Sequence, residues 1–87
     1  MDNRERLIDL SGNDELLCAD GFDECIIGYI MMAGGEQRAL YSYQAMISLM
    51  IERDGMSEEE AIEYFDYNII GYGGDGLPAY AFLFNEE

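Results

Sequence analysis

The sequence predicts a small α+β domain in which a three-stranded antiparallel sheet carries a helical hairpin on one face, in the order β-β-α-α-β. Three observations lead to this prediction. An apolar run at 24–32 is followed, after a glycine-containing turn, by an alternating segment at 38–43. Two helical segments with capping residues come next, between 42 and 70. A last alternating segment covers 79–84.

The strands follow from these apolar patterns. The run ECIIGYIMM (24–32) is apolar but short for a helix, and its Ile and Tyr residues favour a buried strand. The segment 33–37 is a turn because its paired glycines permit positive φ. RALYSY (38–43) alternates as a returning strand does, and AYAFLF (79–84) alternates as a third strand.

The first helix is predicted to begin after Ser42, which can cap it, and to run to about Arg53 before Gly55 ends it. Its centre, Ala45–Ile51, is apolar at every position except Ser48. A helix that is apolar nearly all round lies either deep in a core or against a partner. We therefore expect this segment to offer a homodimer contact, unless the N-terminal segment covers it.

The second helix is the clearest element of the sequence. Ser57 and Glu60 form an S-x-x-E capping box, and Gly71 suits the left-handed position after the last turn. Helical spacing predicts one buried stripe, made of Ala61, Ile62, Phe65 and Ile69.

The N-terminal residues 1–22 read as an arm with one short helical turn, which would begin at Asn13 or Asp14 and cover Leu16 and Leu17. Residues 23–87 then form a single α+β domain, as expected for a chain of 87 residues.

Charge is the most unusual property of the chain. Nineteen acidic residues face four arginines, with no lysine and no histidine, so the net charge is −15. Too few cations are present to bind nucleic acid directly, and an anionic membrane would repel the chain. No apolar stretch is long enough to span a bilayer, and the first residues do not resemble a secretory leader. These features predict a cytoplasmic protein with a cationic partner and with free thiols at Cys18 and Cys25.

Three catalytic or ligand-binding readings are weak. GYGGDG (71–76) fits G-x-G-x-x-G, but a helix precedes it and a strand follows, so a phosphate would meet a helix C-terminus beside Asp75. Asp66, Asn68 and Gly71 fit part of a calcium loop, whereas Leu77 stands where a glutamate is needed. General acid-base catalysis at neutral pH favours histidine, which is absent. We therefore predict a non-enzymatic protein without cofactor or metal.

The acidic helix is the strongest candidate for a binding surface. The predicted partner-binding residues are Glu52, Glu59, Glu63 and Asp66, which can share one exposed side, together with Tyr64 and Tyr67. Tyrosine flanked by carboxylates suits an arginine-rich partner, since the rings stack on guanidinium groups while the acids pair with them. The alternative reading is a solvated acidic face with tyrosines that fill a small core.

The block DGMSEEEAIEYFDYNIIG (54–71), followed by GDGLP (74–78), resembles a family of small acidic proteins, mostly encoded by phages and prophages, of unassigned function. The shared pattern is E-E-A-x-E-[YF]-F-[ED]-[YF]-N-x-x-G, then G-[ED]-G-x-P and a final apolar strand. The resemblance covers about residues 23–84, and this chain departs from it in the shortened, glycine-rich loop YGGDGLP. It implies a phage setting, and no biochemical activity.

Together these features predict a phage-encoded inhibitor that acts in the host cytoplasm. By phosphate mimicry it would occupy a basic host protein that handles nucleic acid, such as a CRISPR effector or a restriction enzyme. The alternative is a homo-oligomeric accessory or structural phage protein, whose charge serves only solubility.

Overall fold

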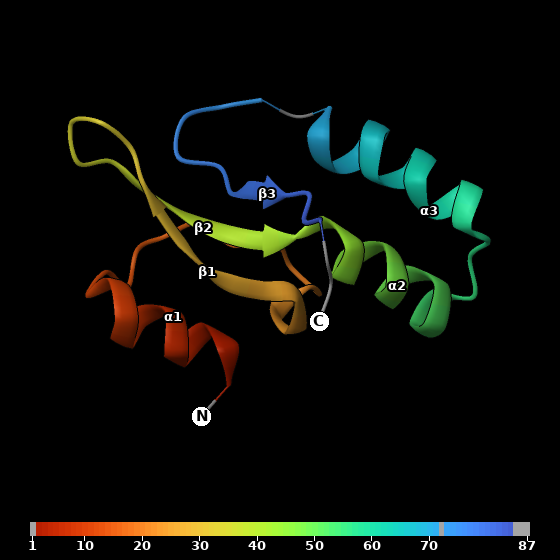
Figure 1. The fold of residues 1–87 in the computed structure, drawn as a ribbon, viewed down its shortest axis with the longest axis horizontal. Coiled ribbons are helices and arrows are strands. Elements are labelled where there is room, and N and C mark those ends of the chain that lie inside the picture. The colour runs from red at the N-terminus through yellow and green to blue at the C-terminus, as the bar shows by residue number, and fades with distance from the viewer. Residues whose placement is uncertain (1, 72, 85–87) are drawn as a thin grey trace.

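The computed structural model describes residues 2–71 and 73–84. The described chain forms three α-helices, two short helical segments and three strands (Figure 1). In chain order these are α1 (Asn3–Ser11), η1 (Asp23–Cys25), β1 (Ile26–Met31), β2 (Gln37–Ser42), α2 (Tyr43–Asp54), α3 (Glu58–Phe65), η2 (Asp66–Ile70) and β3 (Ala79–Ala81). The predicted α+β class and the order β-β-α-α-β are confirmed, with a further helix at the N-terminus.

The sheet has the order β1-β2-β3 and is mixed, so the prediction of a purely antiparallel sheet was wrong. β1 and β2 form the expected antiparallel hairpin, whereas β3 runs parallel to β2, with Leu40 opposite Ala79 and Tyr41 opposite Tyr80. The reason is the path of the chain. α2 leads away from the end of β2 and α3 returns past it, so the chain re-enters the sheet beside Leu40 and runs toward the same end as β2 (Figure 1). β3 is also shorter than predicted and ends at Ala81.

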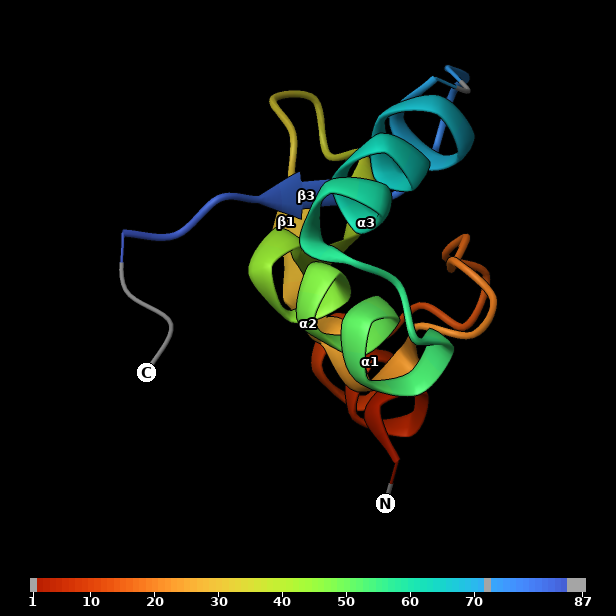
Figure 2. The ribbon, with the colours of Figure 1, turned by 90° about the vertical axis from the view of Figure 1, so that its right-hand side faces the viewer.

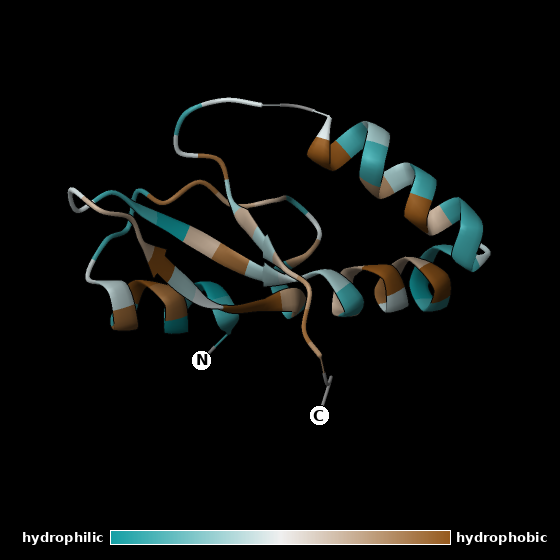
Figure 3. Ribbon diagram, turned by 45° about the horizontal axis from the view of Figure 1, so that its top comes forward, coloured by the Kyte–Doolittle hydropathy of each residue, from teal (hydrophilic) through white to brown (hydrophobic). Residues whose placement is uncertain are grey.

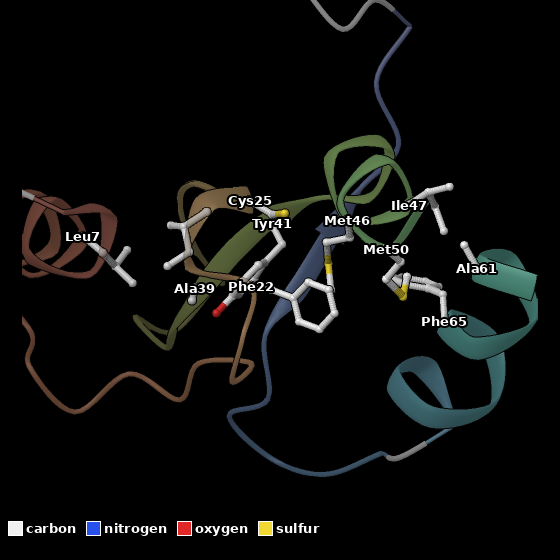
Figure 4. Packing of buried hydrophobic residues seen from close by; sticks show 11 residues of the cluster. Leu7, Phe22, Cys25, Ala39, Tyr41, Met46, Ile47, Met50, Ala61 and Phe65 are labelled. Carbon is white, nitrogen blue, oxygen red and sulfur yellow. The ribbon is translucent and has the colours of Figure 1, made fainter. Parts of the chain in front are cut away.

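The core lies on one face of the sheet, which we call the inner face. Ala39 and Tyr41 of β2 are fully buried there, and the ring of Tyr80 lies 5.8 Å from that of Tyr41. Figure 4 shows the buried side chains in a row that runs from Leu7 through Tyr41 to Phe65. One continuous core therefore joins α1, the sheet and the helical hairpin.

The apolar α2 is largely buried inside the chain itself. Met46 and Met50 are fully buried and Ile47 nearly so, while Ala45 and Leu49 are half-buried against the same core. α3, η1 and the end of the sheet surround this helix. Of the two explanations for its apolar sequence, burial in the core is thus sufficient.

The N-terminal arm was predicted incorrectly. Its helix is α1, whereas Leu16 and Leu17 lie in irregular chain. Asp2 and Glu5 form a capping box, and Gly12 ends the helix with φ of 70°. α1 lies alongside β1 (Figure 1), and the Asn3 amide donates to the carbonyl of Asp23 in the preceding η1 at 3.0 Å. β1 is an edge strand of the sheet, and α1 covers it. The helix thereby shields backbone groups of β1 that would otherwise be free to pair with another chain.

Candidate functional site

α3 begins as the sequence predicts. The hydroxyl of Ser57 accepts a hydrogen bond from the backbone N–H of Glu60 at 3.1 Å, and the Glu60 carboxylate accepts one from the N–H of Ser57 at 2.8 Å. This capping box satisfies two backbone donors that a helix start leaves unpaired. It also fixes the first turn, where Glu58 and Glu59 stand at the positive end of the helix dipole.

The buried stripe of α3 is narrower than predicted. Ala61 and Phe65 are buried and Ile69 packs partly against the core, but Ile62 is 36% exposed, so its placement in the stripe was wrong. α3 packs mainly on α2 and does not lie across the sheet (Figure 1), so only a thin seam is covered. In Figure 3 the helix is therefore mostly hydrophilic, with a few hydrophobic bands. Most of its circumference faces solvent.

Three of the predicted acidic residues share the solvent side of α3. Glu59, Glu63 and Asp66 are all exposed, and their spacing of four and three residues places them along one stripe. On a helix of 100° per residue this stripe lies opposite the seam of Ala61 and Phe65. Asp66 belongs to η2, which continues directly from α3. The structure thus brings these three carboxylates together.

Glu52 lies apart from them. α3 contacts the side of α2 that carries Tyr43, whose ring meets the edge of Phe65 at 4.8 Å. Glu52 is nine residues after Tyr43, which is half a turn away on a helix. It is exposed on the far side of α2. The sequence expectation that Glu52 shares one side with Glu59 is therefore wrong, because sequence proximity could not show how the two helices face each other.

Tyr64 and Tyr67 lie beside this acidic stripe. They are 41% and 77% exposed, which is unusual for aromatic side chains. Both line a shallow hollow of about 320 Å³, with Met56, Glu60, Glu63 and Asn68. Sequence reasoning assigned no binding role to Met56, Glu60 and Asn68, although Glu60 and Asn68 each lie four residues from Tyr64, which was a usable signal. The hollow combines two carboxylates, two phenols and an amide.

The carboxylates of this region have no cation beside them. Of the ion pairs in residues 2–71 and 73–84, two join Arg4 to Asp20 and Asp23, one joins Arg38 to Glu36, and one joins Arg53 to Asp54. The hydrogen bond from Arg53 lowers the pKa of Asp54. None of these described pairs includes the five acids at 58, 59, 60, 63 and 66. The segment therefore carries a concentrated, uncompensated negative charge.

The other candidate motifs lie in different surroundings. The loop 71–76, whose Tyr72 is outside the described residues, follows η2 and precedes β3, so it has the helix-before-strand order that the sequence indicated. Asp66 and Asn68 lie within η2 and not in a loop. In the part of the chain that the structure describes, no three His, Cys, Asp or Glu side chains are placed to hold a metal ion. No helix of these residues is long and apolar enough to cross a bilayer.

Both thiols lie in the N-terminal half. Cys25 is buried, and desolvation, strengthened by the charge of Glu24, raises its pKa to about 11. Such a thiol is rarely ionised near neutrality and is a poor nucleophile. Cys18 is half-buried near Tyr41, whose own pKa is raised by burial. Both cysteines are free.

Two larger hollows lie away from the acidic stripe. One, of about 810 Å³, lies between α1 and β1 and is lined by Arg6, Leu10 and Ile27 among others. The second, of about 530 Å³, lies between residues 18–22 and the loop before β3, and Tyr64 and Asn68 also line it.

No family model, curated protein or solved structure shows a significant match to this chain, so the phage-protein resemblance remains a prediction.

Proposed function

We propose that this chain is a non-enzymatic binding protein that occupies a basic, arginine-rich surface of a nucleic-acid-handling protein. The observation that carries the proposal is the exposed stripe of Glu59, Glu63 and Asp66 beside the hollow that contains Tyr64 and Tyr67. By the resemblance to phage proteins, its target would be a host defence component in the cytoplasm, such as a CRISPR effector or a restriction enzyme. Carboxylates would then take the place of phosphates.

The density of charge supports this mechanism only for α3. Over the whole surface of 5819 Å², the net charge of −15 amounts to one charge per about 390 Å². Duplex DNA, treated as a cylinder, carries one charge per roughly 110 Å². Along α3, five carboxylates fall within nine residues, or one per about 2–3 Å of helix axis. A single DNA strand carries one phosphate per ~3.4 Å, so the helix matches a phosphate chain locally.

The two tyrosines favour arginine over lysine as the group that is bound. A guanidinium group is planar, forms paired hydrogen bonds with carboxylates and stacks on aromatic rings. Tyr64 and Tyr67 line the same hollow as Glu60 and Glu63, so one side chain inserted there would meet both kinds of partner. Arginine clusters are also common on proteins that grip nucleic acid backbones.

The proposal is tested by capture from a host lysate, with the protein immobilised at low salt and eluted at high salt. A nucleic-acid-handling protein released by salt, whose DNA binding the chain then blocks in a competition assay, is the expected result. Capture that is insensitive to salt would contradict the mimicry mechanism, because exposed ionic contacts weaken as salt rises. A captured partner that still binds DNA would contradict it too, because the chain would then not occupy the DNA-binding surface.

A second candidate function is a homo-oligomeric accessory or structural protein whose charge serves solubility. The observation that favours it is the exposed segment of Phe82, Leu83 and Phe84 after β3, which offers apolar surface away from α3. On this reading the acids of α3 contact only water, and reversal of their charge changes solubility alone.

A further inference from the structure

The sheet has a second face, opposite to the core, which we call the outer face. Cross-strand partners point to the same side of a sheet, so the register places Gly28, Leu40 and Ala79 in one row and Ile30 beside Arg38 in the next. Successive residues alternate between faces, so these side chains point away from Tyr41 and the core. The half-buried Ile30 and Leu40 do not belong to the set of residues that pack on the core.

No helix or connecting segment of residues 2–71 and 73–84 lies over the outer face. In Figures 1 and 2 the segment between α1 and β1 lies behind the sheet, and α2 and α3 lie beyond its end. α1 lies alongside the outer strand β1 and does not cross the outer face. A sheet with one apolar face on the core normally carries polar side chains on the other. Apart from Arg38 and Ser42, this one carries only Gly28, Ile30, Leu40, Ala79 and Ala81.

The outer face also carries no acidic side chain among its paired strand residues. Its single charged side chain among the paired strand residues is Arg38, whose Nε lies 3.2 Å from a carboxylate oxygen of Glu36. Gly28 and Ala79 flank Leu40, and a methyl group placed on Gly28 would meet no atom within 4 Å. The residues on both sides of the half-buried Leu40 are thus small, which permits a second sheet to approach closely.

The chain after β3 adds apolar surface at the end of this face. Phe82 is 65% exposed, Leu83 is 41% exposed and Phe84 is fully exposed. Figure 2 shows this segment projecting away from the helices. The ring of Phe82 stacks on Tyr43, with centroids 4.0 Å apart, so the segment has a defined direction.

We propose that two copies of this chain pack outer face on outer face, with the Phe82–Phe84 segments at the rim, to form a symmetric dimer. A partner copy carries the same charge of −15, so it can approach only where carboxylates are sparse. Two sheets pack face to face at about 10 Å, and a two-fold axis makes each face its own complement. This contact differs from the predicted one through Ala45–Ile51, and it leaves the acidic side of α3 free.

The available area matches a dimer that needs both parts of the surface. Two strands of six residues and one of three, with ~3.3 Å per residue and a spacing of about 4.8 Å, give an outer face of roughly 240 Å². Phe82 and Phe84 together add roughly 300 Å², given ~200 Å² for a fully exposed phenylalanine. Two copies would bury roughly 1,100 Å², close to the lower limit of stable interfaces, whereas the sheet faces alone would bury less than half of that.

The test is sedimentation equilibrium of the full chain over a range of concentrations and salt. We expect a monomer–dimer equilibrium whose association strengthens with salt, because salt screens the repulsion between the copies. Leu40→Glu should weaken association by at least about tenfold, since it places a carboxylate in an apolar contact. Phe84→Ala should do the same and cannot unfold the domain, because this side chain contacts nothing in the fold. The matched control is Leu10→Glu on α1, an exposed leucine outside the proposed contact, which should leave association unchanged.

A mass of 9.9 kDa at every concentration and salt would overturn the dimer. A dimer that Leu10→Glu weakens and Phe84→Ala does not would place the contact on the groove between α1 and β1, and would also overturn the proposal. Binding of a basic partner through α3 has the opposite salt dependence, so failure of one proposal is distinguishable from failure of the other.

Discussion

The side-chain amide of Gln44 pairs with the backbone of Leu83 through both of its polar atoms. Its Nε2 donates to the Leu83 carbonyl at 2.6 Å, and its Oε1 accepts from the Leu83 N–H at 3.3 Å. The amide thereby substitutes for a neighbouring strand just after β3 ends. Together with the stacking of Phe82 on Tyr43, it fixes the direction of the exposed apolar segment.

Replacement of Gln44 by alanine should release this segment without unfolding the domain. Both hydrogen bonds are exposed, so we expect a loss of about 0.5–1.5 kcal/mol in the free energy of unfolding. Hydrogen exchange at the Leu83 amide should accelerate at least several-fold, measured by NMR. Glu52→Ala, on the exposed side of the same helix, is the control and should leave this exchange rate unchanged. Equal protection of Leu83 in both variants would show that Gln44 does not hold the segment.

Ser57→Ala should destabilise the protein by about 1 kcal/mol, because it removes the hydroxyl that accepts from the backbone N–H of Glu60. Ser48→Ala is the matched control. Ser48 is exposed in the interior of α2, where alanine is the better helix former, so this change should be neutral or slightly stabilising. Urea unfolding of both variants measures the difference, and equal midpoints would mean that the capping box contributes nothing.

Stability should fall in alkaline solution as Cys25 ionises. Burial raises the pKa of this thiol from 9.0 to about 11, with Glu24 adding to the effect and Arg53 opposing it. The folded state therefore holds its proton after the unfolded state has lost it. The stabilisation is complete below pH 9 and is lost as pH rises through 11, with a slope of at most ~1.4 kcal/mol per pH unit.

The same measurement on Cys25→Ser separates this thiol from other groups. Burial also raises the pKa of Tyr41 and Tyr80, so the protein keeps some alkaline sensitivity in the variant. The slope of unfolding free energy between pH 9 and 11 should nevertheless be shallower than in the parent chain. An unchanged slope would mean that the Cys25 thiol ionises equally in the folded and unfolded states.

Local chemistry in the sequence predicted the starts of α2 and α3 and the end of α2, whereas the prediction of a left-handed Gly71 was wrong, because this residue is right-handed with φ of −63°. Ser42 and Ser57 cap α2 and α3, and Gly55 adopts the left-handed conformation after α2, as their residue types indicated. α1 was missed although Asp2 and Glu5 formed a readable capping box. These features depend on neighbours in sequence, so sequence reasoning can reach them.

Relationships between distant segments could not be read in the same way. The pattern of alternation assigns residues to faces but is identical for parallel and antiparallel strands, so the direction of β3 depended on how the α2–α3 hairpin returns the chain. The placement of Glu52 failed for the same reason. The sequence of α2 fixes only the position of Glu52 around the axis of that helix. Which side of α2 meets α3 is decided by packing around Phe65. The stripe of Glu59, Glu63 and Asp66 lies within one helical region and was predictable.

Truncation of the tyrosines tests the preference for arginine. Tyr67→Ala should weaken binding to an immobilised arginine peptide more than binding to a lysine peptide of equal length, because the planar guanidinium stacks on the ring more extensively than an ammonium group does. The effect should depend little on salt, since stacking is less ionic than carboxylate pairing. Phe84→Ala, which removes an exposed ring far from α3 in the chain, is the control. Equal losses for the two peptides would exclude stacking as the source of selectivity.

Charge reversal tests the acidic stripe itself. The triple variant Glu59→Lys, Glu63→Lys and Asp66→Lys should abolish binding of the captured partner while the domain remains folded. The three side chains are exposed and the seam of Ala61 and Phe65 is untouched. Relief of repulsion between Glu59 and Glu63 offsets the loss of an anion from the first turn, so the unfolding free energy should change by less than about 1 kcal/mol.

Net charge alone would also weaken an ionic contact, so the decisive comparison is a second triple reversal at Asp9, Asp14 and Glu15. These acids are exposed and take part in no described ion pair. Each reversal changes the charge by two, so both variants carry −9 in place of −15. Titration calorimetry at two salt concentrations should show near-parental affinity for the second variant and none for the first. Equal weakening in both would mean that the partner responds to total charge, and full binding by the first would remove α3 from the contact.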